Sequence, residues 1–137
     1  MADITVDRAV AAPAHNLVRL THIMYALHAF SALMGVLTPA FIITAFLTGW
    51  PSIIAVILNY VKRDDVRGTW LESHLAWQLR TFWYAVLWAV VAWLLAITLI
   101  GLVLAVPVAI ALTIWIVYRV ARGWMTLGQG KPIVLKR

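Results

Sequence analysis

The sequence predicts an all-α integral membrane protein, a four-helix bundle whose third helix extends into the cytoplasmic interface. Of its 137 residues, 64% are hydrophobic and only 12% are charged. A soluble domain of this size could not hide so much apolar surface from water, because roughly half of even a soluble surface is already apolar. The charged residues also gather in a few short segments between long apolar runs. We therefore expect lipid to cover most of the chain.

The first apolar region, residues 17–61, is too long for one membrane crossing. Its only formal charge is Arg19. A single helix over this region would measure about 65 Å, whereas the hydrocarbon core needs ~30 Å, or about 20 residues. We therefore expect two crossings, over about residues 17–37 and 40–61, joined by a reversal near residues 35–39.

Gly49, Trp50 and Pro51 interrupt the second of these crossings. We interpret them as a kink within one helix, because proline removes a backbone hydrogen bond. The competing division places the break between helices at residues 49–52. That division would leave residues 51–63 too short to span the membrane, so the kink is preferred, and a re-entrant break is the alternative that the sequence leaves open.

The third crossing lies within a helix that the sequence predicts to begin at Thr69. Thr69 and Glu72 match the capping box, in which the threonine oxygen and the glutamate carboxylate each accept a backbone N–H. No glycine or proline follows before Gly101, which allows a helix of about 48 Å. Such a helix is longer than the membrane is thick, so we place its crossing at about residues 80–100 and its first turns at the cytoplasmic interface.

The fourth crossing is expected over about residues 102–120, with Pro107 near its start. The whole transmembrane unit then comprises residues 15–126 as one domain. Residues 1–14 are expected to form a flexible cytoplasmic tail, since they lack the pattern of a signal peptide. Residues 127–137 are expected to form a basic cytoplasmic tail on the surface.

The positions of the basic residues predict the orientation. Lysine and arginine flank the apolar runs instead of forming one patch, so the net charge of +6 indicates loops that face anionic lipid and not nucleic acid. The two other connections, near Pro39 and Gly101, have no basic residue. Four crossings with both termini and the central loop in the cytoplasm satisfy the positive-inside rule. The basic residues are Arg8, Arg19, Lys62, Arg63, Arg67, Arg80, Arg119, Arg122, Lys131, Lys136 and Arg137.

Two stripes of side chains run along the third helix at intervals of three and four residues. The first is aromatic with polar groups, and we interpret it as interfacial anchoring and helix packing, with a groove for a ligand or lipid headgroup as the alternative. The second consists of alanines, which let helix backbones approach closely, so it predicts a seam against another crossing. The stripes are Trp70, His74, Trp77, Thr81, Tyr84 and Trp88, and Ala85, Ala89, Ala92 and Ala96.

Tyr25 and His28 are the polar residues expected inside the first crossing. By helical rise His28 lies about 16 Å into the membrane, where an ionisable residue is a functional hypothesis. The simpler interpretation is a neutral imidazole that is hydrogen-bonded to a backbone carbonyl, Ser31 or another helix. A b-type haem held by two histidines is a weaker hypothesis, with His22, His28 and His74 as candidates. Only His22 matches the expected depth of His74.

The sequence offers little for catalysis. It has no cysteine, no carboxylate within a predicted crossing and no cluster with zinc spacing. A metal or phosphate-ester site at the cytoplasmic surface is conceivable, but helix caps and ion pairs explain the same charges. Its residues would be Asp64, Asp65, Glu72 and His74. We therefore predict no enzymatic activity, no cofactor and no metal site.

The most economical function is that of a non-enzymatic accessory or assembly subunit of a larger membrane complex. The chain has no sizeable soluble segment, which favours dependence on a membrane-protein partner or on a homo-oligomer. The alternative is an oligomeric channel or carrier whose polar path includes His22, Tyr25 and His28, and a haem-binding electron carrier is the third hypothesis. The candidate interaction face consists of Arg63, Arg67, Trp70, Glu72, His74, Trp77 and Arg80.

Three strings carry a resemblance to a known family: LTHIMYALHAF, ILNYVKRDDVRGTWLESHLAWQLRTFWYAVLW and IWIVYRVARGWMTLGQGKPI. Over residues 20–132 the chain resembles a family of small, uncharacterised proteobacterial membrane proteins that are distantly related to the Tic20-type chloroplast import component. The chain departs from the family at Leu75 and Ala76, where an aromatic and a basic residue are frequent. The resemblance implies a multi-pass location in the bacterial cytoplasmic (inner) membrane, but it implies no biochemical activity.

Overall fold

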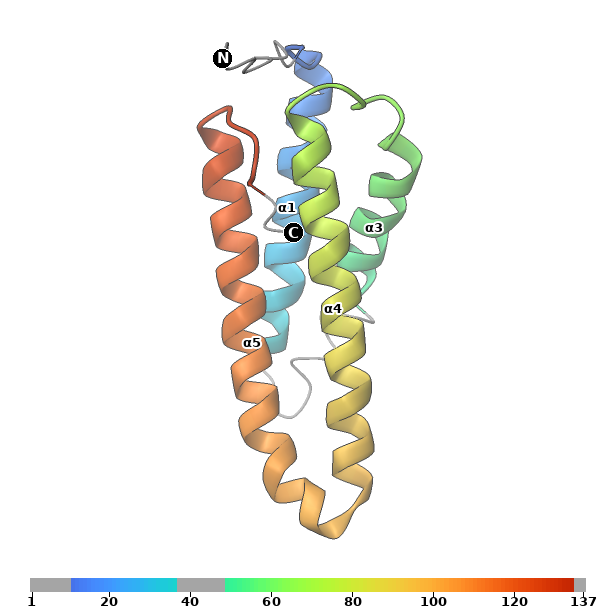
Figure 1. Cartoon of the computed structure of the whole chain (residues 1–137), viewed down its shortest axis with the longest axis vertical. Coiled ribbons are helices and arrows are strands. Elements are labelled where there is room, and N and C mark those ends of the chain that lie inside the picture. Colours follow the sequence, from blue (N-terminus) through green and yellow to red (C-terminus); the bar gives the residue numbers. More distant parts are fainter. Residues whose placement is uncertain (1–10, 37–48, 135–137) are drawn as a thin grey trace, which may run out of the picture.

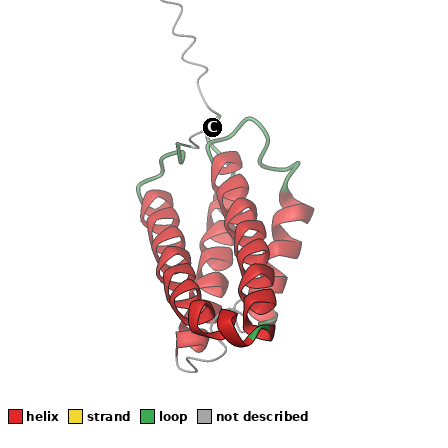
Figure 2. Ribbon diagram, turned by 60° about the horizontal axis from the view of Figure 1, so that its bottom comes forward, coloured by secondary structure: helices red, strands yellow, loops and turns green. Residues whose placement is uncertain are grey.

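The computed structural model describes residues 11–36 and 49–134, and within these ranges it contains four α-helices and no strand. The expected all-α class is therefore confirmed. Three of the helices are long and apolar enough to cross a membrane, over His15–Met34, Leu71–Ile97 and Val103–Gly128. The helices are α1 (His15–Val36), α3 (Trp50–Lys62), α4 (Leu71–Ile97) and α5 (Leu99–Gly128). Figure 1 labels them, and Figure 2 shows the helices in red.

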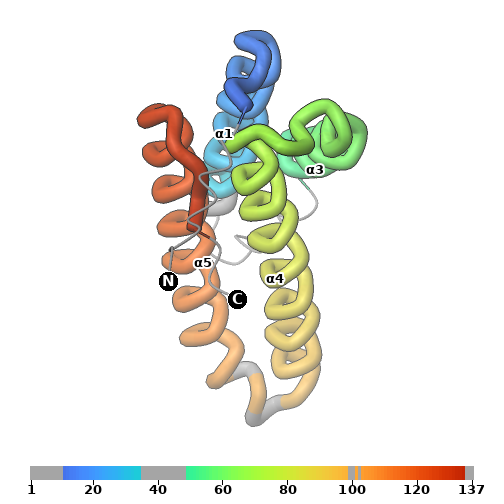
Figure 3. The backbone as a smooth tube through the Cα atoms, turned by 45° about the horizontal axis from the view of Figure 1, so that its top comes forward, coloured from blue at the N-terminus to red at the C-terminus, as the bar shows by residue number. Residues whose placement is uncertain are grey.

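The four helices pack side by side in a ring, in which each helix runs opposite to its neighbours in the ring. Within the described residues α1 contacts α3 and α5, and α4 contacts the same two helices. No contact joins α3 to α5, which lie on opposite sides of the α1 and α4 pair (Figure 3). The start of α1, the loop of residues 63–70 and the end of α5 consequently share one end of the molecule (Figure 1), which we call the basic end.

The α4–α5 hairpin is longer than the rest of the bundle and extends past α1 and α3 (Figure 1). The prediction that the third helix continues unbroken to Gly101 is wrong, because Thr98 adopts an extended conformation with φ −91° and ψ 138°. The Thr98 hydroxyl accepts a hydrogen bond from the Gly101 N–H at 3.0 Å and so caps α5. The fourth helix is also longer than the predicted crossing of residues 102–120, since it continues to Gly128.

The helix α3 begins where a kink was expected. Gly49 has an extended backbone and is the residue before the first helical turn, which contains Pro51. Proline is tolerated in a first turn, since the N–H that it lacks would have no helical partner there. The expected continuous crossing of residues 40–61 is thus wrong at residues 49–51, and residues 40–48 lie outside the described residues, as does most of the expected reversal at 35–39. The 13 residues of α3 span about 20 Å, less than the ~30 Å of a hydrocarbon core.

The expected capping box at the start of α4 is also wrong. The Thr69 hydroxyl donates to the Val66 carbonyl at 2.7 Å, and α4 begins at Leu71 without a side-chain cap. The Glu72 carboxylate accepts instead from the Gly68 N–H at 3.1 Å. Gly68 has a positive φ of 72°, which brings the loop backbone to the glutamate one residue earlier than a capping box requires.

The segment that follows α5 folds back along the bundle and covers the start of α4. The expectation of a surface tail from residue 127 is wrong for two side chains, because Leu127 and Ile133 are buried. The Ile133 N–H donates to Ser73 Oγ at 2.9 Å, and Leu127 belongs to the hydrophobic core. Residues 135–137 and 1–10 lie outside the described residues, and Ala11 forms a single β-bridge with Thr69.

Candidate functional site

A buried hydrogen bond joins α1 to α4 near the basic end. Tyr25 Oη lies 3.1 Å from His74 Nδ1, and His74 Nε2 lies 2.7 Å from the carbonyl oxygen of Lys131. A carbonyl only accepts, so Nε2 carries a proton, and in the neutral ring Nδ1 accepts from the tyrosine hydroxyl. The Trp70 ring and the imidazole pack in a T-shaped arrangement, with 5.6 Å between their centroids. His74 thereby connects three parts of the chain: α1, α4 and the C-terminal segment.

Gly123 on α5 makes room for the tyrosine in this cluster. A Cβ atom at Gly123 would lie 2.5 Å from both Cε1 and Oη of Tyr25, which is closer than real Cβ contacts. The tyrosine ring therefore packs directly on the backbone of α5. Nothing in the sequence indicates this contact, since the two residues are far apart in the chain and the glycine lies within a helical pattern.

A second set of buried polar contacts attaches α3 to its neighbours. The Ser52 N–H, in the first turn of α3, donates to Ser31 Oγ on α1 at 3.1 Å. His28 Nδ1 lies 3.2 Å from Ser52 Oγ. At the other end of α3 the Asn59 side-chain amide donates to Gln78 Oε1 on α4 at 2.7 Å. The expectation of a hydrogen-bonded His28 is confirmed, with a serine of another helix next to it.

Three arginines surround one hollow between α4 and α5, which we call the arginine hollow. It measures about 370 Å³ and has aromatic side chains between the arginines. Arg80 comes from α4, whereas Arg119 and Arg122 come from α5. Each of Arg80 and Arg119 lies about 13 Å from the basic end of its own helix, so the two helices bring them to one depth. The lining residues are Trp77, Arg80, Tyr84, Trp115, Tyr118, Arg119, Arg122 and Val134.

Arg119 is held firmly in this hollow. Its Nε donates to Thr81 Oγ1 at 2.9 Å, and its guanidinium carbon lies 3.5 Å from the centroid of the Trp77 ring. The Trp77 indole N–H in turn donates to the backbone carbonyl of Arg119 at 3.0 Å. A cation over an indole face is stabilised by the ring quadrupole. These contacts fix the arginine side chain with its terminal nitrogens still available, since none of them is bonded to a described residue.

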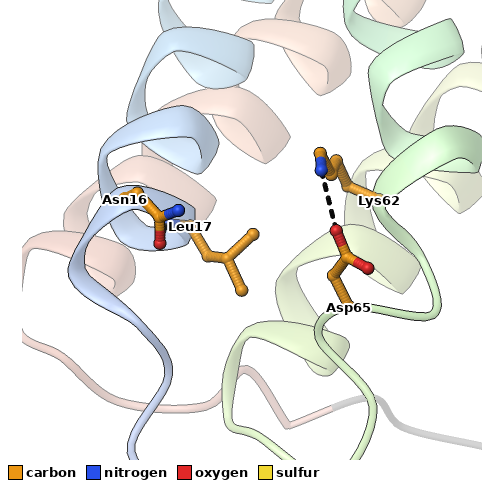
Figure 4. A network of polar contacts seen from close by, with 4 residues as sticks. All are labelled: Asn16, Leu17, Lys62 and Asp65. Atoms are coloured by element: carbon orange, nitrogen blue, oxygen red, sulfur yellow. Dashed lines mark hydrogen bonds and ion pairs between the residues drawn. The ribbon is translucent and has the colours of Figure 1, made fainter.

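No carboxylate neutralises the arginine hollow within the described part of the chain. Among the described residues, ion pairs occur at the exposed end of α3 and in the loop after it, between Lys62 and Asp65 at 2.8 Å (Figure 4) and between Arg67 and Asp64 at 3.3 Å. The remaining described carboxylate, Glu72, faces the Gly68 N–H. The hollow therefore concentrates positive charge beside aromatic surface, which is a suitable environment for an anion.

An apolar groove of about 490 Å³ lies next to the arginine hollow on the same pair of helices. Trp115 lines both spaces. The other residues of the groove lie further from the basic end than the arginines do. Trp88, for example, lies about 12 Å beyond Arg80 along α4. The residues lining the groove are Trp88, Val108, Ala111, Leu112 and Trp115.

The structure divides the predicted interaction face into exposed and buried parts. Arg63, Arg67, Glu72 and Arg80 are exposed, and Trp70 is half-buried. His74 and Trp77, however, are buried in the bundle. The seven residues thus do not form one continuous surface, because α4 turns its histidine and Trp77 towards α1, α5 and the C-terminal segment.

The two predicted stripes of α4 also have different environments along their length. In the aromatic stripe, His74, Trp77 and Thr81 are buried, whereas Tyr84 and Trp88 are exposed beside the two hollows. In the alanine stripe, Ala85 and Ala92 are buried, Ala89 is half-buried and Ala96 is exposed. Helix α5 is the principal neighbour of α4 as a whole.

The structure does not bring together the residues of the haem and metal sites that were weighed from the sequence. Both ring nitrogens of His74 are engaged, by Tyr25 and by the Lys131 carbonyl, so His74 has no free nitrogen for a haem iron. His22 Nδ1 accepts from the Trp124 indole N–H at 3.1 Å. Asp64 and Asp65 in the loop pair with basic side chains, and Glu72 in α4 bonds to the Gly68 N–H, so these carboxylates are engaged away from His74. Across the described residues, no group of three or more potential metal ligands occurs.

The arginine hollow was missed by sequence reasoning. Its α5 residues, Trp115, Tyr118, Arg119 and Arg122, follow the spacing of one helical face, which was the available signal. The positive-inside rule already accounted for Arg119 and Arg122 as charges that flank a crossing, so their position on one helical face was not considered.

Comparison with known proteins gives no relative. No protein family model, no curated protein and no solved structure matches the chain. The resemblance to the Tic20-related family therefore stays a prediction, and function has to be argued from the geometry alone.

Proposed function

We propose that the chain is a multi-pass integral protein of the bacterial cytoplasmic membrane, with both termini in the cytoplasm. In this proposal it acts as a non-enzymatic accessory or assembly subunit, through helix packing in the membrane and through its basic end. Its partner would be another membrane protein, or further copies of the same chain, together with the surrounding lipid. The proposed relation to the Tic20-type proteins would agree with this location.

The α4–α5 hairpin carries the proposal. This hairpin extends past α1 and α3 (Figure 1). It also exposes large apolar side chains, of which Trp93 is 65% exposed and Val103 is 76% exposed. Exposed apolar surface on this scale needs lipid or a protein partner in place of water. All described lysines and arginines are nearer the basic end of the bundle than the tip of the hairpin, as expected for a protein whose basic side faces the cytoplasm.

Membrane topology can be tested by labelling single cysteines, because the chain has none of its own. We expect Asp65→Cys to react with a membrane-impermeant maleimide in inverted vesicles, and Ile97→Cys, at the hairpin tip, to react in spheroplasts. Labelling of both positions from the same side, or recovery of the protein in the soluble fraction, would contradict the proposal. Detergent-permeabilised samples, in which both cysteines react, provide the control.

The accessory role can be tested by purification from native membranes in mild detergent. We expect one membrane protein at fixed stoichiometry, and we expect the double variant Arg63→Glu and Arg67→Glu to lose it. These two arginines are exposed in the loop at the basic end, so their replacement should leave the bundle folded. A chain that is recovered without any stoichiometric partner would count against the accessory role.

A channel or carrier is the second candidate, and one observation favours it. A cavity of about 10 Å³, large enough for one water, lies inside the bundle. Its lining includes Tyr25, His28, Gln78, Thr81 and Arg119. Solute flux in liposomes that is abolished by His28→Ala would support this function. His22, which was also expected in the polar path, does not line the cavity and bonds to Trp124.

A further inference from the structure

We propose that the arginine hollow and the apolar groove beside it form a binding site for one anionic phospholipid. The phosphate group would lie among Arg80, Arg119 and Arg122, and an acyl chain would lie along the groove. This inference rests on the membrane location in the proposed function, but it adds a ligand class and a site to it.

Charge is the first argument for this ligand. Three guanidinium groups share the hollow without a carboxylate partner in the described part of the chain. Guanidinium groups bind phosphate through paired hydrogen bonds and remain charged at any physiological pH. Arg119 presents its terminal nitrogens from a fixed position on Trp77, so little side-chain entropy is lost when an anion binds.

Hydrogen-bonding groups of a second kind complete the polar part of the site. Tyr118 Oη accepts from Arg122 Nη1 at 2.8 Å, which directs that arginine along the helix. Tyr84 lines the hollow from the opposite helix. Tyrosine and tryptophan are typical of the headgroup region of a membrane, where one part of the ring is in apolar surroundings and the other is near water.

The neighbouring groove distinguishes a lipid from a free anion. A site for inorganic phosphate would need only the arginines, whereas here the polar space continues past Trp115 into an apolar space of similar size. The order along the helices is also that of a phospholipid in its leaflet, with the charged group nearer the basic end and the apolar groove deeper. In the proposed orientation this is the cytoplasmic leaflet, which is rich in anionic lipid.

The test measures lipid binding to the purified protein by native mass spectrometry. Phosphatidylglycerol and phosphatidylcholine with identical acyl chains are compared, and inorganic phosphate is added as a competitor. We expect phosphatidylglycerol to bind at least tenfold more tightly than phosphatidylcholine. Arg80→Gln and Arg122→Gln should each weaken phosphatidylglycerol binding about fivefold, the effect of roughly one basic residue near a membrane surface. Arg19→Gln, which removes an exposed arginine of α1 outside the hollow, should change binding less than twofold.

A groove variant tests the acyl chain separately. Ala111→Phe should fill part of the groove and weaken the binding of both lipids. Because Arg119 also connects α4 to α5, the exposed Arg80 and Arg122 carry the test. Equal affinity for the two lipids, equal loss in Arg19→Gln, or displacement of the lipid by millimolar phosphate would each overturn the site. Cysteine labelling of the same variants tests the membrane location independently, so failure of the lipid site is distinguishable from failure of the proposed function.

Discussion

Tyr25 on α1 donates a buried hydrogen bond to His74 on α4, across 3.1 Å and between residues that are both at most 1% exposed. The same imidazole holds the C-terminal segment through the Lys131 carbonyl. One side-chain pair thus connects the beginning, the middle and the end of the chain at the basic end of the bundle.

Removing the tyrosine hydroxyl should destabilise the fold. In Tyr25→Phe the Nδ1 atom of His74 keeps its buried position but loses its donor, and an unsatisfied buried group costs about 1–3 kcal/mol. We expect a lower midpoint of thermal unfolding in detergent. Tyr60→Phe is the matched control, because Tyr60 is exposed and its bond to Trp83 is also exposed. An equal loss in both variants would contradict the importance of the buried pair.

Adding a methyl group at Gly123 should separate α5 from α1. Gly123→Ala places a Cβ atom 2.5 Å from the Tyr25 ring, and overpacking of this kind costs about 1–3 kcal/mol. The measurement is the free energy of unfolding in denaturant. Gly128→Ala is the control, since no heavy atom lies within 4 Å of its Cβ position. Wild-type stability in Gly123→Ala would show that the tyrosine can move away without loss.

The C-terminal segment should loosen when Ser73 loses its hydroxyl. Ser73 Oγ accepts the Ile133 N–H at 2.9 Å, so Ser73→Ala leaves that amide without its acceptor. We expect faster hydrogen exchange at the Ile133 amide, by about fivefold to tenfold for a bond worth roughly 1 kcal/mol. Thr126→Val, which removes a hydroxyl bonded within α5 itself, should leave this exchange rate unchanged.

Ser31 should be required for the docking of α3. The Ser52 N–H belongs to the first turn of α3, where no helical acceptor exists, and Ser31 Oγ supplies one from α1. Ser31→Ala should therefore lower the free energy of unfolding by about 1–2 kcal/mol. Thr113→Val offers a comparison, because its hydroxyl bonds only to Ala109 of its own helix. Equal losses at both positions would indicate a general effect of removing a hydroxyl.

The local sequence pattern was sufficient to predict features that depend only on residues close together in the chain, such as helices. The apolar runs predict four membrane-crossing helices, because backbone groups in such segments can be satisfied within a helix, and among the described residues three helices are long and apolar enough to cross. The capping box failed because the Thr69 hydroxyl bonds to the Val66 carbonyl and the Glu72 carboxylate bonds to the Gly68 N–H, so both side chains use other backbone groups of the loop. The break at Thr98 had a signal, since threonine is a good N-cap residue, but the absence of glycine and proline concealed it.

The sequence by itself determined that the chain is helical and largely apolar, and that its basic residues alternate with connections that have none, which predicts one basic end. Hydrophobic periodicity and the positions of charges are local properties of the sequence, so helices and basic segments can be predicted without knowledge of the fold. Only the tertiary structure decided that Arg119 rests on Trp77 beside Arg80, that Gly123 makes room for Tyr25, and that Ile133 returns to Ser73. These contacts join distant segments, and their energies depend on distances that only helix packing sets.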